Sequence, residues 1–467
     1  MHYVSTRGFE GPGGSPLNFT DILLSGTAPD GGLYVPVGWP TIPNSAQMRM
    51  HGLSYDTIAT QIMKPFVGDA FDEATLNTLC VKAYENFRHK TVAPLIQIGP
   101  NAWLMELFHG PTLAFKDVAM QFLGHAFDAA LEKKGQKITI IGATSGDTGS
   151  AAIEAFKNKK NINLFMLHPA GRVSEVQRKQ MTTVDDNNIH NIAIDGSFDD
   201  CQAIVKTLFN DKKLNDACKL SAVNSINWAR IMAQIVYYAF ASLSLGAPDR
   251  AVSFAVPTGN FGNVFAAYVA RRMGFPIKKL IIGSNQNDIL TRFFASGEMK
   301  KGDVVQTLSP SMDIQISSNF ERLLFDLLDR EPDRINKKMD SFRDTGLFRI
   351  DPDKLVLARS LFDARRVNDD MTRQTIKMYY NATGLIIDPH TAVGIAAAEA
   401  TYDDPATPVV ALGCAHPAKF PDAIESAIGI RPTLPDFMAD LMDRAEHVTP
   451  MANDATKVRD FIIKNSD

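Results

Sequence analysis

Hydrophobic residues follow a regular alternation along the middle of the chain. Between residues 137 and 297, short apolar runs of strand length are each followed by a longer segment with helical periodicity. Apolar strands that alternate with helices are typical of parallel sheets covered on both faces. The pattern therefore predicts an α/β fold, with strands at "KITIIGAT", "NINLFMLHP", "NIHNIAID", "AVSFAVPTG" and "KKLIIGSNQ".

The two ends of the chain have different patterns. The first 95 residues contain Gly- and Pro-rich turns and two helical segments at 55–68 and 72–87, and two strands follow at 91–99 and 102–108. Residues 300–370 are more charged and less regular, and the alternation returns with a helix, a strand and a helix at 388–401, 408–416 and 418–429. We predict an N-terminal domain (1–95), a core of two α/β lobes (96–430, the smaller lobe near 112–222) and a C-terminal extension packed on the core (431–467).

Composition excludes several classes of protein. The 467 residues are 45% hydrophobic and 21% charged, with a net charge of −4, and no basic block points to nucleic acid. No apolar run is long enough to span a bilayer, and the start of the chain lacks the pattern of a secretory signal. The four cysteines form no C-x-x-C pair and the ten histidines are scattered, so we expect reduced thiols, a cytoplasmic protein and no metal.

One lysine stands at the start of a helix. In "HGPTLAFKD", Gly110 and Pro111 end a strand, Thr112 is a candidate helix cap, and the helix that contains Lys116 runs to Gly135. A cation in the first turn is mildly unfavourable because the positive end of the helix dipole lies there. Taken alone, Lys116 is either an ordinary surface lysine or a functional one.

The first glycine-rich turn between a strand and a helix is "TSGDTG". Thr144, Ser145 and Thr148 supply hydroxyl groups, and the helix start supplies free N–H groups, which together suit a small anion such as a carboxylate. A simpler reading is a helix capped by Ser145 or Asp147, although a cap explains one polar residue and not four.

The second turn, "PTGNFGN", has the same setting. Gly259 and Gly262 allow successive N–H groups to converge on a phosphate, with the side chains of Asn260 and Asn263 nearby. Neither a Walker loop nor a dinucleotide fingerprint is matched, so a small phosphorylated cofactor fits better than a nucleotide. Tight-turn packing is the alternative.

The third turn, "LGCAHPAKF", ends a strand with Cys414, His416 and Lys419. Cys414 alone reads as a small buried residue, whereas His416 and Lys419 together favour anion binding, since both side chains can be cationic. A functional lysine, a phosphate turn and a carboxylate turn fit one idea. A lysine that forms a Schiff base needs a carbonyl cofactor, and pyridoxal phosphate is the usual phosphorylated one.

The chain resembles the threonine synthases, pyridoxal-phosphate enzymes of the fold-type II group that includes the tryptophan synthase β-subunit. The matching motifs are spread over nearly the whole chain, and the separate N-terminal unit is similar to the longer bacterial and fungal class. In chain order they are "YVSTRG", "GGLYVP", "HGPTLAFKD", "TSGDTG", "NSINWARI", "PTGNFGN", "SPSMDI", "DPHTAVG" and "HPAKF".

The resemblance implies a role for each group of residues. Lys116 carries the cofactor, Cys414 lies beside its pyridine nitrogen, and the cofactor phosphate is held by Gly259, Asn260, Phe261, Gly262 and Asn263. The substrate carboxylate is held by Thr144, Ser145, Asp147 and Thr148. An aspartate at position 147 would repel an anion unless it is protonated or turned away, so its role stays open. For the substrate phosphate our hypothesis names the cations Lys419, His416 and Arg230, with Ser225 and Asn227 as neutral donors.

The implied reaction converts O-phospho-L-homoserine and water to L-threonine and phosphate, in a monomer or homodimer. Two alternatives stay open. A phospholyase on the same scaffold would release 2-oxobutanoate and ammonia, and a non-catalytic metabolite-binding protein would have no use for Lys116. A nucleotide-binding enzyme is disfavoured because the fingerprint is missing.

Overall fold

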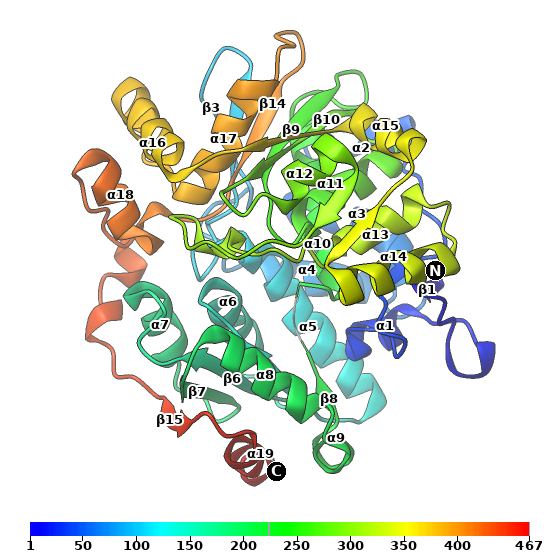
Figure 1. Ribbon diagram of the computed structural model, residues 1–467, viewed down its shortest axis with the longest axis vertical. Helices are drawn as coiled ribbons and strands as arrows, with labels where there is room; N and C mark the ends of the chain where they lie inside the picture. The colour runs from blue at the N-terminus through cyan, green and yellow to red at the C-terminus, as the bar shows by residue number, and fades with distance from the viewer. Residues whose placement is uncertain (223–224, 467) are drawn as a thin grey trace.

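The larger of two parallel sheets organises the upper half of the molecule in Figure 1. The computed structural model describes residues 1–222 and 225–466. The order of this six-stranded sheet is β13-β10-β9-β14-β4-β3, and only the edge pair β3–β4 is antiparallel. Its strands are Phe362–Arg366, Ile277–Ser284, Val252–Pro257, Val409–Gly413, Ala102–Glu106 and Leu95–Gln97.

Alternate residues of the larger sheet enter two separate cores. Ala255, Ile281 and Ala411 face helix α17 (Pro389–Thr401), whereas Phe254 and Leu280 join the main core. Successive side chains of a strand point to opposite faces, so a strand buried on both faces is apolar throughout. The predicted parallel sheet with helices on both faces is confirmed. The helices α10 (Trp228–Ser244), α11 (Gly262–Arg272) and α12 (Ile289–Ser296) contribute to the main core.

The smaller sheet lies below the larger one in Figure 1. Its order is β15-β7-β6-β5-β8, and all its strand pairs are parallel. The strands are Thr449–Ala452, Ile189–Asp195, Ile162–Pro169, Ile138–Ala143 and Leu220–Ser221. The helices of this lobe are α6 (Asp147–Phe156), α7 (Glu175–Thr182), α8 (Phe198–Phe209) and α9 (Lys212–Cys218).

The N-terminal residues pack against the helices between the two sheets. Buried side chains of α3, such as Ile62 and Phe66, share the main core with α5 (Lys116–Lys134) and α10. The elements before α5 are β1 (Tyr3–Ser5), η1 (Pro12–Gly14), α1 (Phe19–Ser25), β2 (Tyr34–Pro36), α2 (Asn44–Met50), α3 (Tyr55–Val67) and α4 (Glu73–Tyr84).

Residues 300–370 contain more regular structure than the sequence indicated. A two-stranded antiparallel sheet of β11 and β12 and three α-helices precede β13, which is the edge strand of the larger sheet. Its sequence, "FDARR", is polar because the outer strand is covered only in part. The elements are β11 (Glu298–Lys300), η2 (Pro310–Met312), α13 (Phe320–Leu327), α14 (Pro332–Thr345), β12 (Leu347–Arg349) and α15 (Pro352–Leu361), and α16 (Asp369–Thr383) follows β13.

The C-terminal residues run from α18 down one side of the molecule and end on the smaller lobe (Figure 1). Strand β15 extends the smaller sheet beside β7, and Val458 and Ile462 of α19 are buried with its side chains. The extension therefore completes the smaller lobe. Its elements after β14 are η3 (Pro417–Lys419), α18 (Pro421–Ile428), η4 (Asp436–Met438), η5 (Leu441–Asp443), β15 and α19 (Ala455–Lys464).

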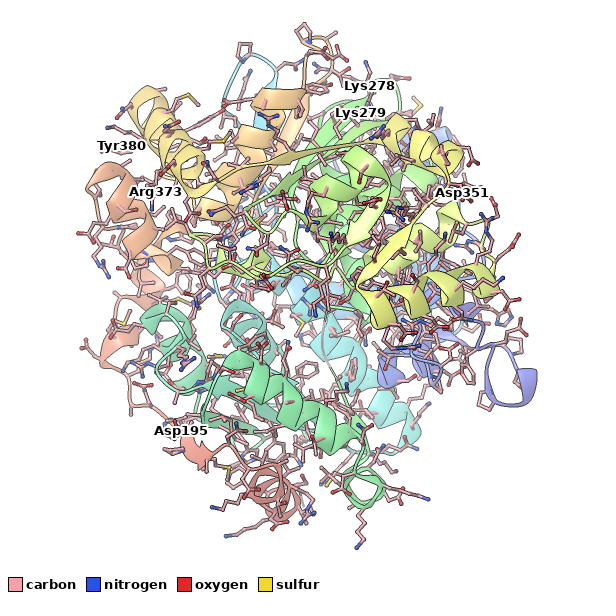
Figure 2. All side chains as sticks on the ribbon, viewed as in Figure 1. Asp195, Lys278, Lys279, Asp351, Arg373 and Tyr380 are labelled. Atoms are coloured by element: carbon pink, nitrogen blue, oxygen red, sulfur yellow. The ribbon has the colours of Figure 1, made fainter. Side chains whose placement is uncertain are left out.

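Several charged side chains at the rim of the molecule belong to ion pairs. Figure 2 shows Lys278, Lys279, Asp351 and Arg373 at the periphery. The ion pairs are Lys278–Asp404, Lys279–Asp363 at 3.3 Å, Arg334–Asp351 at 3.3 Å and Arg373–Asp370 at 2.9 Å.

None of the helices in residues 1–222 and 225–466 has the length and apolar character needed to cross a bilayer.

Candidate active site

Lys116 is the first residue of α5, and its segment pairs with the end of β14. Phe115 N donates to Cys414 O at 2.8 Å, and His416 N donates to Leu113 O at 3.0 Å. This short pairing brings the lysine segment beside the third sequence turn, where Lys419 follows. Two motifs 300 residues apart in the sequence therefore form one site.

The turn before Lys116 is closed by Asp117 and not by a helix cap. Thr112 donates to the Asp117 carboxylate through its N–H at 2.8 Å and its hydroxyl at 2.6 Å. The helix itself begins after Phe115 with no side-chain cap, so the predicted cap by Thr112 is wrong. Gly110 is required here, since a Cβ would lie 2.5 Å from the Cβ of Asp117. Burial raises the pKa of Asp117 to about 6, although the bonds from Thr112 oppose the shift.

Asp147 lies between two lysines. Lys116 Nζ is 3.1 Å from Asp147 Oδ2, and Lys419 Nζ is 2.9 Å from Asp147 Oδ1. Gln177 Nε2 donates to Oδ1 at 2.8 Å, and the Ser311 hydroxyl donates to Oδ2 at 3.3 Å. Two ammonium groups and one carboxylate leave one net positive charge at the centre of the site.

The charge of Asp147 is set by these neighbours. Burial alone would raise the pKa of its carboxyl group, but the nearby charges of Lys116 and Lys419 hold the pKa well below its usual range. Asp147 is therefore ionised and turned toward cations. An aspartate paired in this way does not present a free charge to an incoming anion, and its role toward the substrate stays a prediction.

Lys419 is completely buried and has three acceptors. In addition to Asp147, its Nζ donates to Thr112 O at 2.7 Å and to Gln180 Oε1 at 2.9 Å. The three N–H donors of the ammonium group are all used, so this lysine has to exchange a partner when it binds a substrate.

Two glutamines of α7 were missed by the sequence analysis. Gln177 binds Asp147, and Gln180 binds both Lys419 and Thr112 O, the latter at 3.1 Å. The helix "EVQRKQMT" reads as a polar surface helix, but both glutamines are buried. Gln180 is buried where α7 meets Thr112 and Lys419. No local signal in the sequence distinguishes them.

The "TSGDTG" turn is held together by Thr144. Its hydroxyl accepts from Gly146 N at 3.0 Å and from Gly149 N at 2.9 Å, so it organises the loop. Ser145 is exposed and Thr148 is half-buried, which leaves both hydroxyls available to a ligand. The helix α6 begins at Asp147 after Gly146 and has no side-chain cap, so the capping alternative is wrong for Ser145 and for Asp147.

The "PTGNFGN" turn lies at the start of α11. Within the described residues, the N–H groups of Asn260, Phe261, Gly262 and Asn263 have no protein acceptor. The side-chain nitrogen of Asn263 is buried and likewise lacks a partner in this part of the chain. Donors that converge at a helix N-terminus without acceptors fit a phosphate.

The stretch near residue 310 contacts both the "PTGNFGN" turn and the "TSGDTG" turn. Ser317 donates its hydroxyl to Gly259 O at 2.7 Å, and Asn319 N donates to Asn260 O at 3.1 Å. Gly259 lies against this stretch, because a Cβ there would be 3.2 Å from the Cα of Met312. This part of the chain, whose role the sequence did not reveal, therefore shapes the phosphate turn and contacts Asp147 through Ser311.

Cys414 is buried at the end of β14 and is fixed by the start of α17. Its N–H donates to the Thr391 hydroxyl at 2.9 Å, and Thr391 donates in turn to Asp388. Burial, with the negative charge of Asp388, raises the pKa of the Cys414 thiol well above its usual range. The thiol is neutral, as a partner for an uncharged pyridine nitrogen would be.

The remaining predicted residues lie in different settings. The amide of Asn227 caps α10 by accepting from Ala229 N at 3.0 Å and donates to Leu23 O at 2.9 Å, which gives it a structural role. Ser225 is half-buried, and its carbonyl oxygen accepts from Asn319 Nδ2 at 3.1 Å. Arg230 is buried on α10, where burial lowers its pKa to about 10.

His416 differs from the expected cation. Its Nδ1 accepts from Ala418 N at 3.2 Å, and burial, assisted by His109, lowers its pKa. This environment disfavours a positive charge on the ring, and a role for His416 toward the substrate phosphate stays a prediction.

Three family profiles cover nearly the whole chain. They are described as "Threonine synthase N terminus" for residues 2–84, "Pyridoxal-phosphate dependent enzyme" for 89–414 and "Threonine synthase, C-terminal" for 391–462.

Individual relatives agree with these profiles. The threonine synthase of Pseudomonas aeruginosa is 49% identical over 100% of this chain and 99% of its own length, and that of Saccharomyces cerevisiae is 42% identical over 88% and 87%. Among solved structures, the threonine synthase of Brucella melitensis with bound pyridoxal phosphate has a TM-score of 0.97 and 50% identity, covering 100% of this chain and 99% of that one.

Proposed function

Because the chain belongs to the threonine synthase family, we propose that it converts O-phospho-L-homoserine and water to L-threonine and phosphate. The reaction makes it a carbon–oxygen lyase that acts on a phosphate ester. Its cofactor is pyridoxal phosphate, and its fold is that of the fold-type II enzymes. We further propose a monomer or homodimer in the cytoplasm.

The single observation that carries this proposal is the cluster of Lys116, Asp147 and Lys419. One lysine binds the aldehyde of the cofactor and a second cation remains for the substrate phosphate. A metabolite-binding protein without catalysis would need neither an amine beside a phosphate turn nor a second buried lysine.

The proposed cofactor site combines Lys116 with residues of the "PTGNFGN" turn and the "LGCAHPAKF" turn. Lys116 would hold the cofactor covalently, the free N–H groups of Asn260 to Asn263 would bind its phosphate, and the Cys414 thiol would face its ring nitrogen. When bound, pyridoxal phosphate withdraws electrons from the substrate and so acidifies the hydrogens on Cα and then on Cβ.

Lys116 is the general base of the proposed reaction. With the cofactor bound to the substrate amine, the free amine of Lys116 would take the proton from Cα, release it to the bound cofactor and then take one from Cβ as phosphate leaves Cγ. It would return one proton to Cγ, and the proton released earlier would go back to Cα. Asp147, 3.1 Å away, favours the ammonium form that results. Water then adds at Cβ to give threonine.

Lys419 is the cation for the departing phosphate. It exchanges one of its three acceptors for a phosphate oxygen, and Gln180 keeps the ammonium group in place through a second bond. The substrate carboxylate would bind the N–H groups and hydroxyls of Ser145 and Thr148 at the start of α6.

Product analysis tests the proposal. With O-phospho-L-homoserine we expect one equivalent of phosphate and one of L-threonine. Release of phosphate with 2-oxobutanoate and ammonia would instead identify a phospholyase, and no phosphate release with bound cofactor would indicate a binding protein.

A further inference from the structure

Asn263 is held by two tyrosines that the mechanism does not use. Tyr238 Oη donates to Asn263 Oδ1 at 2.7 Å, and Tyr237 Oη donates to the same oxygen. The three side chains are buried, and the two rings lie 4.8 Å apart between centroids. Tyr238 also packs edge-on against Phe254 of β9, the strand that leads into the phosphate turn.

This convergence is unusual for adjacent residues of one helix. Neighbouring side chains on a helix diverge by about 100°, and yet both hydroxyls reach one oxygen atom. Two buried hydroxyl donors occupy the oxygen of the amide and so fix which way the amide faces. The Nδ2 group then lies on the opposite branch of the amide, and it has no partner in the residues that the structure describes.

We propose that Tyr237 and Tyr238 are positioning residues for the cofactor phosphate, because they hold the Asn263 amide with its nitrogen, and not its oxygen, available to the phosphate at the start of α11. A reversed amide would present an oxygen to an anion and would lose one attractive contact and gain a repulsive one. The inference rests on the proposed function, since it assumes that a phosphorylated cofactor binds this turn.

The phosphate group itself provides the test. Pyridoxal lacks the phosphate but keeps the aldehyde and the ring, so only the phosphate form should sense the orientation of Asn263. We would titrate the cofactor-free protein with pyridoxal phosphate and with pyridoxal, and follow the absorbance of each complex.

In the double variant Tyr237→Phe/Tyr238→Phe we expect the affinity for pyridoxal phosphate to fall about tenfold or more, as for a weakened hydrogen bond to a charged group. The affinity for pyridoxal should stay within about twofold of the wild type. The variant Asn263→Asp, which replaces the nitrogen by an oxygen of similar size, should lose still more affinity for the phosphate form.

Tyr84→Phe is the matched control. Tyr84 is buried on α4, and its hydroxyl has no partner among the described residues, so this change removes a hydroxyl without breaking a bond. The affinity of the Tyr84→Phe variant for pyridoxal phosphate and for pyridoxal should equal that of the wild type.

Two results would overturn the inference. Equal losses for pyridoxal and pyridoxal phosphate would mean that the tyrosines act only on folding or on the lysine side of the site, and no loss for either ligand would mean that they do not orient Asn263. If the double variant does not fold, the two single variants decide in the same way. A wild type that binds neither ligand contradicts the proposed function instead.

Discussion

At the scale of single residues, the site depends on a carboxylate shared by two buried lysines. The sequence indicated Lys116, Asp147 and Lys419 from three separate motifs, and it left the role of Asp147 open. Their distances of 3.1 Å and 2.9 Å follow from tertiary contacts that no local pattern encodes. For the same reason Gln177 and Gln180 could not be predicted. Asn227 caps α10, and its predicted role toward the substrate stays a prediction.

Asp147→Asn should destabilise the cofactor-free protein at pH 7. Removing one partner of a buried ion pair leaves uncompensated charge, which costs about 3–5 kcal/mol in the free energy of unfolding. Because the pKa of Asp147 is depressed in the folded state, its stabilisation is present above the ordinary carboxyl pKa of 3.8 and is lost as the pH falls below that value.

Urea unfolding of wild type and Asp147→Asn at pH 7, 5 and 3.5 measures this effect. The difference should be constant between pH 7 and 5 and smaller at pH 3.5. Ser145→Ala, at the exposed neighbouring loop position, is the control and should change stability by less than about 0.5 kcal/mol. A difference that does not depend on pH would show that the pKa of Asp147 is not lowered in the folded state.

Lys419→Ala should impair substrate binding far more than cofactor loading. The variant removes the cation proposed for the substrate phosphate, and a charge-assisted bond in a buried site is worth about 1.5–3 kcal/mol, or roughly 10–150-fold in KM. Steady-state kinetics and the absorbance of bound cofactor measure the two effects separately. Unchanged KM would remove Lys419 from the phosphate site.

At the scale of elements, the alternation of strands and helices was predicted well. The edge strand β13 and the start of α5 were not. Strands such as β6 and β9 are mostly apolar because both faces are buried, and this signal is visible in the sequence. Strand β13 was missed because an edge strand needs few apolar residues. The start of α5 was misread because Thr112 binds a side chain, Asp117, in place of the helix backbone.

Gly149→Ala should disturb the loop that carries Asp147. A Cβ at position 149 would overlap with the side chain of Thr144 and lie 2.7 Å from Met181 Sδ, so the loop or α7 has to shift. Such overpacking typically costs about 1–3 kcal/mol. Thermal unfolding should show this loss, and KM should rise.

Gly38→Ala is the matched control for this change. No atom lies within 4 Å of a Cβ at Gly38, and stability should change by less than about 0.5 kcal/mol. Equal stability of the two variants would show that the "TSGDTG" loop tolerates displacement.

At the scale of the whole molecule, the C-terminal residues complete the smaller lobe. Strand β15 pairs with β7, and Glu446 binds Arg178 of α7 and accepts from the Thr182 hydroxyl at 2.7 Å. The same helix carries Gln177 and Gln180 into the site. The end of the chain is thereby connected to the residues that hold Asp147 and Lys419.

Ile462→Ala on α19 should loosen the smaller lobe in particular. Ile462 is buried with side chains of β6 and β7, and truncating a buried isoleucine costs about 2–5 kcal/mol. Hydrogen exchange should increase in β7 and α8 and stay near the wild-type level in β9 and β10. Ile463→Ala removes the adjacent, 42% exposed side chain and is the control. Uniform acceleration over both sheets would show that the lobes do not open independently.

The most direct test of the central claim is the position of the covalent bond to the cofactor. The purified chain would be incubated with pyridoxal phosphate, reduced with borohydride, digested and analysed by mass spectrometry. We expect the reduced cofactor on the peptide that contains Lys116, and its loss from that peptide in the variant Lys116→Ala together with loss of threonine formation. Cofactor found only on other lysines, or full activity in Lys116→Ala, would contradict the account.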